Sequence, residues 1–316
     1  MGRPAAGSPA ASRTIPRMNP QRIRVASCQY FIRPVERFEQ FEAQVEGLVD
    51  TAADYGVKLL VFPEYFTCQL LTTLKARDQP IDRQVRHLAA LEGRIVEMFQ
   101  RLARKSGMYI VGGTLPAVDP PDLETLYNES YLYAPSGEWE VQGKIHMTRF
   151  EKEEWKVSPH TTYRVFDTGI GKIAINICYD VEFPELARAA ALRGADILVV
   201  PSCTDDRQGF LRVRYCAAAR AIENQMYVVH SGTVGSLPNI PAVSLNYGQA
   251  SVLSPSDFGF GRDGIIAEGV PNQESMILGE LDLSLLKERR DSGTVLPLED
   301  ARSAKSYRES TEVVRL

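Results

Sequence analysis

The stretch KIAINICYDVEFPEL, residues 172–186, decides how the chain is expected to fold. Its first half alternates and is rich in isoleucine, which predicts a strand over 172–177. Its second half runs into a segment rich in Ala, Leu, Glu and Arg, which predicts a helix over 181–193. Asp180 stands where the helix N-cap is expected, and Pro184 would lie in the first turn. The stretch therefore predicts a tight strand-to-helix turn.

Cys178 lies on this predicted turn, which would hold its sulfur in the open. The positive end of the helix dipole would also favour the thiolate form of the side chain. This is the arrangement of a nucleophile elbow with sulfur in place of a serine oxygen. The alternative is an inert buried cysteine, because cysteine is among the most buried residue types. Cys203 is a rival nucleophile, since it also follows a predicted strand, but it lacks the acid-rich helix start.

Strands and helices alternate along the chain between residues 22 and 282, with no change of composition and no linker. The pattern predicts strands at 22–30, 58–62, 109–114, 197–201, 226–232 and 249–254, and helices at 37–55, 83–106 and 210–224. It also predicts one hairpin from 128–134 and 138–144 and a closing hairpin from 264–268 and 275–281. We therefore expect a single α/β domain over 22–285, with mixed sheets covered by helices.

The two ends of the chain differ from this domain. Residues 1–21 are rich in Pro, Ala, Gly and Ser and lack the apolar middle of a secretory signal, which predicts a disordered leader. Residues 286–316 end in polar sequence and are predicted to form a C-terminal arm or tail.

The composition limits the class of function. The 316 residues are 44% hydrophobic and 24% charged, with a net charge of −4, as in an ordinary soluble globular protein. No basic field is available for nucleic acid or an anionic membrane surface, and no apolar stretch approaches the roughly 18 residues that span a bilayer. The five cysteines contain no Cys-x-x-Cys and the four histidines no metal-ligating pair, so we expect no metal and no other cofactor. A cytoplasmic location fits this cysteine usage.

Three more polar side chains follow predicted strands. Glu64 comes directly after the apolar strand 58–62 and a proline, Lys144 ends the second strand of the hairpin, and Glu151 lies just beyond it. In α/β folds ligand sites gather where strands end and loops begin, so we expect these groups near Cys178. For Glu64 alone, a surface acid on a loop is the competing interpretation.

Together these residue types form a set suited to acyl transfer. Glu64 can accept the thiol proton of Cys178 and later return a proton to the leaving amine. Lys144 can stabilise an oxyanion with its ammonium, and Glu151 can keep that lysine charged and aimed. The backbone N–H of Tyr179 is expected to be a second oxyanion donor. No histidine is convincingly placed to pair with the cysteine as in a papain-like site.

Three motifs around these residues resemble those of the carbon–nitrogen hydrolase superfamily, often called the nitrilase superfamily. They are FPE at 62–64, QGKIH at 142–146, and NICYD at 176–180 followed by FPE at 183–185. Their order and separations are similar to those of the family, in which a Glu, a Lys and a Cys are catalytic. The segment from Lys144 through Glu151 to Trp155 also resembles the family loop that carries a second structural or catalytic glutamate.

The resemblance covers about residues 22–285 and implies a four-layer α-β-β-α sandwich. It implies a thioester or thioimidate intermediate on Cys178 that water then attacks. It also implies a homodimer or a larger homo-oligomer, with the helices at 181–193 and 210–224 at the interface. The charged residues of the second helix would form ion pairs there or a solvated face; they are Arg212, Arg214, Arg220 and Glu223.

We expect a thiol hydrolase of the amidase or carbamoylase type that cleaves the non-peptide C–N bond of a small amide and releases ammonia or an amine. The alternative is a nitrilase that converts a nitrile to a carboxylic acid and ammonia. The shortage of histidines disfavours a metal-dependent hydrolase, and the intact Glu, Lys and Cys disfavour a non-catalytic scaffold. The stretch 201–206 is expected at the pocket mouth. The residues expected to bind substrate are Tyr65, Tyr179, Phe183, Cys203 and Thr204.

Overall fold

The computed structural model describes residues 22–74, 79–119, 122–303 and 310–315. The leader predicted at 1–21 lies outside these residues. Among the helices described, none is long and apolar enough to cross a bilayer. Over the same ranges, no group of three His, Cys, Asp or Glu side chains is arranged to hold a metal ion.

Twelve strands form one continuous mixed sheet in this part of the chain. They are β1 Arg22–Ile32, β2 Leu59–Phe62, β3 Tyr109–Asp119, β4 Asp122–Tyr133, β5 Trp139–Gly143, β6 Val165–Thr168, β7 Gly171–Ile175, β8 Ile197–Ser202, β9 Tyr227–Gly235, β10 Ser251–Leu253, β11 Ile265–Glu268 and β12 Ser275–Asp282. The main path runs β5-β4-β3-β2-β1-β9-β8-β7-β6. The pair β1 and β9 is parallel and joins the two halves of the sheet.

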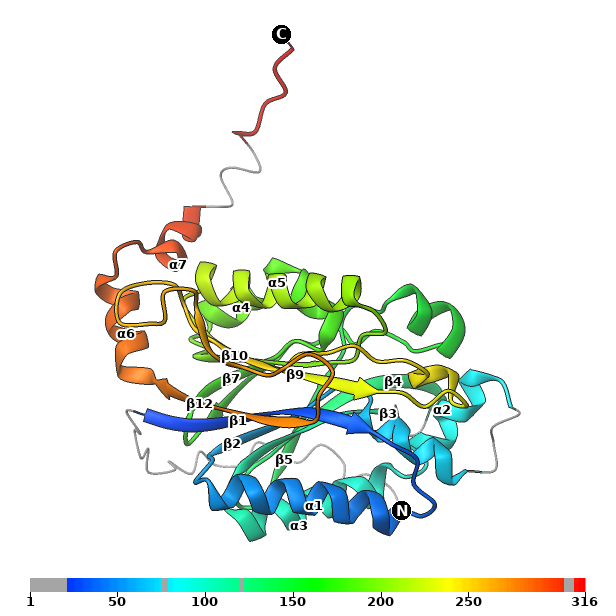
Figure 1. The fold of residues 1–316 in the computed structure, drawn as a ribbon. Helices are drawn as coiled ribbons and strands as arrows, with labels where there is room; N and C mark the ends of the chain where they lie inside the picture. The colour runs from blue at the N-terminus through cyan, green and yellow to red at the C-terminus, as the bar shows by residue number, and fades with distance from the viewer. Residues whose placement is uncertain (1–21, 75–78, 120–121, 304–309, 316) are drawn as a thin grey trace.

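Helices cover both outer faces of this folded sheet (Figure 1). α1 and α3 lie on one side, and α4 and α5 lie on the other, so the layers run α-β-β-α. The predicted four-layer sandwich is confirmed. The helices are α1 Phe38–Asp54, α2 Ile81–Ala89, α3 Glu92–Ser106, α4 Pro184–Leu192, α5 Arg207–Glu223, α6 Leu283–Ser292 and α7 Pro297–Asp300.

The sequence of β2 shows why the sheet is covered on both faces. All four of its residues are fully buried. Leu60 and Phe62 belong to the core beneath α1 and α3, where the rings of Phe62 and Phe99 meet at 5.4 Å. Leu59 and Val61 belong to a second core that includes β7, β8 and the inner face of α5. A continuous apolar run is what a strand buried on both faces requires.

The prediction of one long helix over 83–106 is wrong, because the chain forms two helices there. The N–H of Leu91 donates to the carbonyl of Leu88 at 2.9 Å, and the helical pattern restarts with Ile95 N–H to Leu91 O at 3.0 Å. The break lets α2 pack on the 3₁₀ turn Phe66–Thr73 while α3 packs on α1. Gly93 stands two residues after the break, but the hydrophobic periodicity runs through it, so the apolar pattern alone predicts one helix.

The predicted closing hairpin of 264–268 and 275–281 is also wrong. β11 pairs with β10, and β12 lies antiparallel to β1. β12 can pair with β1 because β9 occupies only residues 29–32 of β1. Residues 22–29 on the same edge of β1 are left for β12. β12 then leads into α6, whose Leu286 is buried in the core. The arm predicted from residue 286 therefore begins inside a packed helix, and residues 310–315 lie apart from the sandwich (Figure 1).

Candidate active site

Cys178 lies on a strained turn at the end of β7. Its φ is +48°, in the left-handed region that costs a non-glycine residue about 1–3 kcal/mol. A 3₁₀ turn, Cys178–Glu182, follows, and α4 begins only at Pro184. The tight turn is present as expected, but the helix predicted from residue 181 starts later.

Asp180 does not cap the helix, so that prediction is wrong. The N-cap position of α4 is Phe183, which makes no side-chain capping bond. The carboxylate of Asp180 instead accepts hydrogen bonds from the N–H of His146 at 2.7 Å and the N–H of Ile145 at 3.2 Å. These amides belong to the segment directly after Lys144. Asp180 therefore ties the turn that carries Cys178 to the segment that follows Lys144.

Glu64 lies on a loop that its neighbours fix closely. Tyr65 has a φ of +54°, and the carbonyl of Glu64 accepts a hydrogen bond from Thr233 Oγ1 at 2.7 Å. Gly113 lies directly under this loop with a φ of +64°, and a Cβ there would stand 2.2 Å from the carbonyl oxygen of Pro63. Only glycine allows that approach. The carboxylate is thus delivered from a rigid loop at the end of β2.

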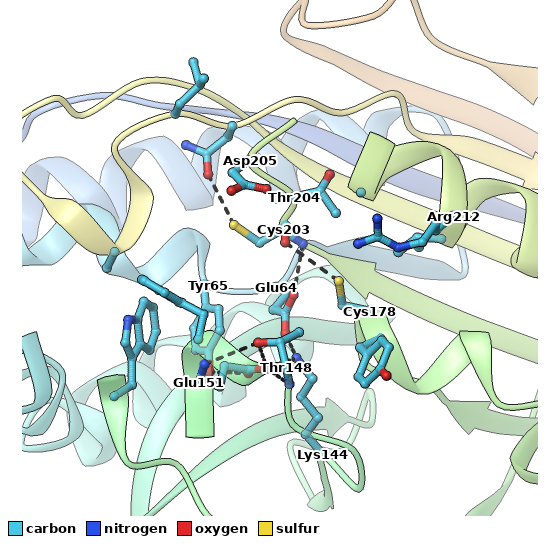
Figure 2. Close-up of a pocket in the computed structure, with 18 of the residues that line it drawn as sticks. Glu64, Tyr65, Lys144, Thr148, Glu151, Cys178, Cys203, Thr204, Asp205 and Arg212 are labelled. Carbon is cyan, nitrogen blue, oxygen red and sulfur yellow. Dashed lines mark hydrogen bonds and ion pairs between the residues drawn. The ribbon is translucent and has the colours of Figure 1, made fainter. Parts of the chain in front are cut away.

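Lys144 lies between two carboxylates. Its Nζ is 2.8 Å from Glu64 Oε1 and 2.7 Å from Glu151 Oε2, and all three side chains are buried. Glu151 begins a π-helical turn, Glu151–Trp155, a form that often marks functional sites. Tyr65 donates its O–H to Glu151 Oε1 at 2.8 Å (Figure 2).

The two carboxylates are also bonded to residues that were not predicted. Asn128 Nδ2 donates to Glu64 Oε1 at 2.9 Å and to Glu151 Oε1 at 3.1 Å. Thr148 donates its N–H and its hydroxyl to Glu151 Oε2, at 3.0 and 2.9 Å. The N–H of Cys203 donates to Glu64 Oε2 at 3.0 Å. Each carboxylate oxygen therefore has at least one partner, which buried charges require.

These contacts shift the pKa values of the two carboxylates in opposite directions. Burial raises the pKa of Glu64, and the ammonium of Lys144 opposes that rise without cancelling it. Burial acts on Glu151 in the same sense, but Lys144, Thr148 and Tyr65 outweigh it, so the pKa of Glu151 is lowered. Burial disfavours the ammonium of Lys144, yet Glu151 and Glu64 hold its pKa well above the ordinary value. Lys144 thus lies between a carboxylate whose pKa is lowered, Glu151, and one whose pKa is raised, Glu64.

The expectation that a helix dipole makes Cys178 a thiolate is wrong. Burial and the nearby Glu64 raise the pKa of the Cys178 thiol well above its usual value, although Lys144 acts in the opposite sense. The intervening 3₁₀ turn separates the sulfur from the N-terminus of α4. The resting side chain is therefore a thiol, whose Sγ lies 3.7 Å from the carbonyl oxygen of Cys203.

Four side chains form what we call the cavity floor: Glu64, Lys144, Glu151 and Cys178. They line one cavity of about 430 Å³ (Figure 2). The other lining residues are Tyr65, Thr148, Phe150, Trp155, Tyr179, Glu182, Cys203, Thr204, Asp205, Gly209, Arg212, Val213, Pro241, Ala242, Ser244, Leu245 and Asn246.

Four of the five predicted pocket residues line this cavity, namely Tyr65, Tyr179, Cys203 and Thr204. Phe183 is not among the lining residues. Its ring stacks on His146, with ring centroids 3.6 Å apart, so it supports the lysine segment. The thiol of Cys203 is directed to Asn246 Oδ1 at 3.2 Å, so the rival cysteine contributes its backbone to the site (Figure 2).

Three charged side chains form what we call the cavity mouth: Glu182, Asp205 and Arg212. Asp205 lies in the stretch expected there. Arg212 was expected either to form an ion pair at a subunit interface or to lie on a solvated helix face. Within the chain its Nε lies 3.5 Å from Glu182 Oε1, and Arg220 pairs with Glu223.

Comparison with known proteins identifies the class. Residues 24–291 match the model of the carbon–nitrogen hydrolase family, so the chain belongs to that family and is a hydrolase of carbon–nitrogen bonds. It is 44% identical over 280 residues to the probable hydrolase YhcX of Bacillus subtilis (strain 168), covering 89% of this chain and 54% of that protein. The chain thus spans about half the length of that relative.

Two further matches extend over nearly the whole domain. The omega-amidase NIT2-A of Xenopus laevis is 27% identical over 279 residues, covering 85% of this chain and 92% of that protein. The crystal structure of Saccharomyces cerevisiae Nit3, a member of branch 10 of the nitrilase superfamily, has a TM-score of 0.69 and 27% identity. The match covers 86% of this chain and 94% of that one. Hydrolysis of amide C–N bonds is thus an activity of the family.

Proposed function

We propose that this chain hydrolyses the C–N bond of a small amide through a covalent thioester on Cys178. Glu64 acts as general base and then general acid, Lys144 stabilises the oxyanion, and Glu151 keeps Lys144 charged. The observation that carries the proposal is the convergence of these four side chains on one cavity floor. The omega-amidase activity named for the Xenopus relative favours an amide as substrate.

In the first step, Sγ of Cys178 attacks the carbonyl carbon of the amide. The S–H proton passes to Glu64, the S–C bond forms, and the carbonyl π electrons move onto oxygen. The proton moves between two groups of the same buried site, which avoids the cost of a buried thiolate formed by losing its proton to water. The ammonium of Lys144 and the backbone N–H of Tyr179 stabilise the oxyanion.

Glu64 then donates its proton to the leaving nitrogen as the C–N bond breaks, and ammonia or an amine departs. Water attacks the remaining thioester and gives one proton to Glu64. The C–S bond breaks, the carboxylic acid is released, and the sulfur of Cys178 recovers the proton from Glu64. The raised pKa of Glu64 suits a group that must hold and return a proton in each half of the cycle.

The test is a panel of small primary amides, N-carbamoyl compounds and nitriles, assayed for ammonia and for the acid product. We expect the wild-type chain to release both from an amide, and we expect Cys178→Ala and Glu64→Gln to lose nearly all activity. Circular dichroism shows whether each variant is folded. Near-wild-type turnover by folded Cys178→Ala would exclude the mechanism. Faster conversion of a nitrile than of any amide would establish the nitrilase alternative.

We also propose a homodimer or larger homo-oligomer. Large apolar side chains are exposed on the outer layer of α4 and α5, with Leu192 54%, Tyr215 66% and Ile222 46% exposed. Light scattering should give at least twice the 35.2 kDa chain mass. A monomer at micromolar concentration would contradict this.

We also propose a cytoplasmic location from the cysteine usage, since all five cysteines are free thiols. Cell fractionation tests this proposal.

A further inference from the structure

Asn128 is bonded to all three charged groups of the cavity floor. It lies on β4 and is fully buried. Its carbonyl oxygen accepts a hydrogen bond from the N–H of Lys144 at 2.9 Å. Its side-chain Nδ2 donates to Glu64 Oε1 at 2.9 Å and to Glu151 Oε1 at 3.1 Å, and these two carboxylates flank the ammonium of Lys144. Lys144 and Asn128 therefore close a ring of hydrogen bonds with the two carboxylates.

The carboxylates determine which end of the Asn128 amide faces them. Both N–H groups of Nδ2 are used, whereas Oδ1 is buried and has no hydrogen-bond partner among the residues described. The reverse orientation would set Oδ1 against two carboxylate oxygens, which would repel it. The side chain thus leaves its acceptor unpaired, which lowers stability, and keeps both donors on the carboxylates.

The two oxygens of Glu64 are bonded unequally. Oε1 accepts from Lys144 Nζ at 2.8 Å and from Asn128 Nδ2 at 2.9 Å, which fills the acceptor sites of one carboxylate oxygen. Oε2 accepts one hydrogen bond of ordinary length from the residues that the structure describes, the N–H of Cys203 at 3.0 Å. Its second acceptor site is therefore open to a proton.

The backbone of Cys203 contacts both Oε2 and the sulfur of Cys178. Its N–H donates to Glu64 Oε2, and its carbonyl oxygen lies 3.7 Å from Cys178 Sγ (Figure 2). One residue thus holds the atom that gives up a proton in the proposed reaction and the carboxylate oxygen that has acceptor capacity left. Proton transfer requires the two atoms within hydrogen-bond reach, so this arrangement favours Oε2 over Oε1.

We propose that Asn128 is a positioning residue that, together with Lys144, occupies Oε1 of Glu64, so that Oε2 alone exchanges the proton. The S–H bond of Cys178 breaks as an O–H bond forms on Oε2, and Oε2 then returns the proton to the leaving nitrogen. This inference rests on the proposed amide hydrolysis and adds the atom that carries the proton and the residue that selects it. Asn128 does not line the cavity, so it acts on the reaction through Glu64.

Asn128→Leu removes both donors and the unpaired Oδ1 at similar side-chain size. The fold should survive, because Glu64 Oε1 keeps Lys144 and Glu151 Oε1 keeps the hydroxyl of Tyr65. We expect kcat to fall by about tenfold, the low end for a lost hydrogen bond to a charged group, with KM within about twofold. A donor on a carboxylate favours its ionised form, so its loss should raise the pKa of Glu64. The fall of kcat/KM in acid should therefore move up by about one pH unit.

Asn128→Asp separates hydrogen bonding from shape. Ionised aspartate has nearly the shape of asparagine but no N–H donor. It would set a third carboxylate against Glu64 and Glu151, so kcat should fall further than in Asn128→Leu. A packing role alone predicts the reverse order, because aspartate fills the site of asparagine better than leucine does. Urea denaturation shows whether each variant is folded, and Asn128→Leu decides the question if Asn128→Asp does not fold.

Asn224→Leu is the matched control. Asn224 is also fully buried, and its Oδ1 also lacks a hydrogen-bond partner within the described ranges. Its Nδ2 donates to the carbonyl of Arg220 at 3.1 Å, and the residue does not line the cavity. The substitution removes the same chemical groups, so kcat per folded molecule and the pH at which kcat/KM falls should stay at their wild-type values.

Alkylation of Cys178 by iodoacetamide reports the proton transfer to Glu64 without amide turnover. The rate, followed by mass spectrometry of the Cys178 peptide, should fall in acid at a pH about one unit higher in Asn128→Leu than in wild type. Asn224→Leu should not move it. An unchanged pH profile in folded Asn128→Leu would overturn the inference, whatever the change in kcat. If the wild type hydrolyses no amide and the alkylation profile still shifts as expected, the proposed function alone is rejected.

Discussion

The cavity floor and the cavity mouth are built in opposite ways. On the floor, Glu64, Lys144 and Glu151 are buried, and their charged atoms are bonded at 2.7 to 3.1 Å to one another and to Asn128. At the mouth, the one ion pair of Arg212 is 3.5 Å long and largely exposed. On the floor every carboxylate oxygen is hydrogen-bonded, whereas the mouth has unused donors and acceptors.

Under the proposed function, this difference separates two tasks within one cavity. Groups that must be held in one geometry through several proton transfers benefit from a closed set of hydrogen bonds. Groups that select a substrate must keep bonding capacity for it. Substitutions on the floor should therefore lower kcat strongly, and substitutions at the mouth should change substrate preference with little effect on stability.

After the near-complete losses expected of Cys178→Ala and Glu64→Gln, the largest effect is expected from Lys144→Met, which removes the proposed oxyanion donor. We expect kcat to fall by about 10²- to 10³-fold, on the order of 3 kcal/mol of transition-state stabilisation. Steady-state kinetics with a good amide substrate measures this. A loss confined to KM would show that Lys144 only binds the ground state.

Glu151→Gln should lower both activity and stability. It removes the counter-ion of a buried ammonium, and breaking a buried pair costs about 3 kcal/mol. Because the folded pKa of Glu151 is lowered, its ionisation stabilises the protein above the unfolded pKa, and this contribution is lost as pH falls through the folded pKa. The gap in unfolding free energy between wild type and variant should therefore narrow in acid. A gap that stays constant with pH would contradict this.

The pH profile should report Glu64 as the base. Its pKa is raised by burial, so kcat/KM should fall as pH decreases through a value above the ordinary carboxyl pKa of about 4.3. Stopped assays at constant ionic strength measure the pH at which kcat/KM falls in acid. A fall at or below the ordinary carboxyl pKa would show that another group is the base.

The smallest effect is expected from Asp205→Asn at the mouth. The free energy of unfolding should change by no more than about 0.5 kcal/mol, because the side chain is exposed and has no ion-pair partner among the described residues. Urea denaturation measures this. A loss of several kcal/mol would show that the mouth is as tightly integrated as the floor.

Sequence reasoning brought Glu64, Lys144 and Cys178 together because each lies at or just after the end of a predicted strand, and strand ends converge in α/β folds. It misassigned Asp180, because a carboxylate before a helix can cap it or bind another loop, and local sequence does not contain the amides of Ile145 and His146.

Other parts depend on contacts that a linear pattern does not encode. Asn128 bonds both carboxylates because the register of the hairpin places it between them. In the sequence it is only a polar residue at the start of a predicted strand. Thr148 bonds Glu151 through a π-helical turn, which has no sequence signature. The thiol pKa of Cys178 depends on burial and on Glu64, far away in sequence.

The most direct test of the central claim is mass spectrometry of the enzyme quenched in acid during turnover. The account predicts an added mass equal to the acyl group of the amide, located on the peptide that contains Cys178 and absent from Cys178→Ala. Turnover with no adduct at any quench time, or an adduct on Cys203 in its place, would contradict it.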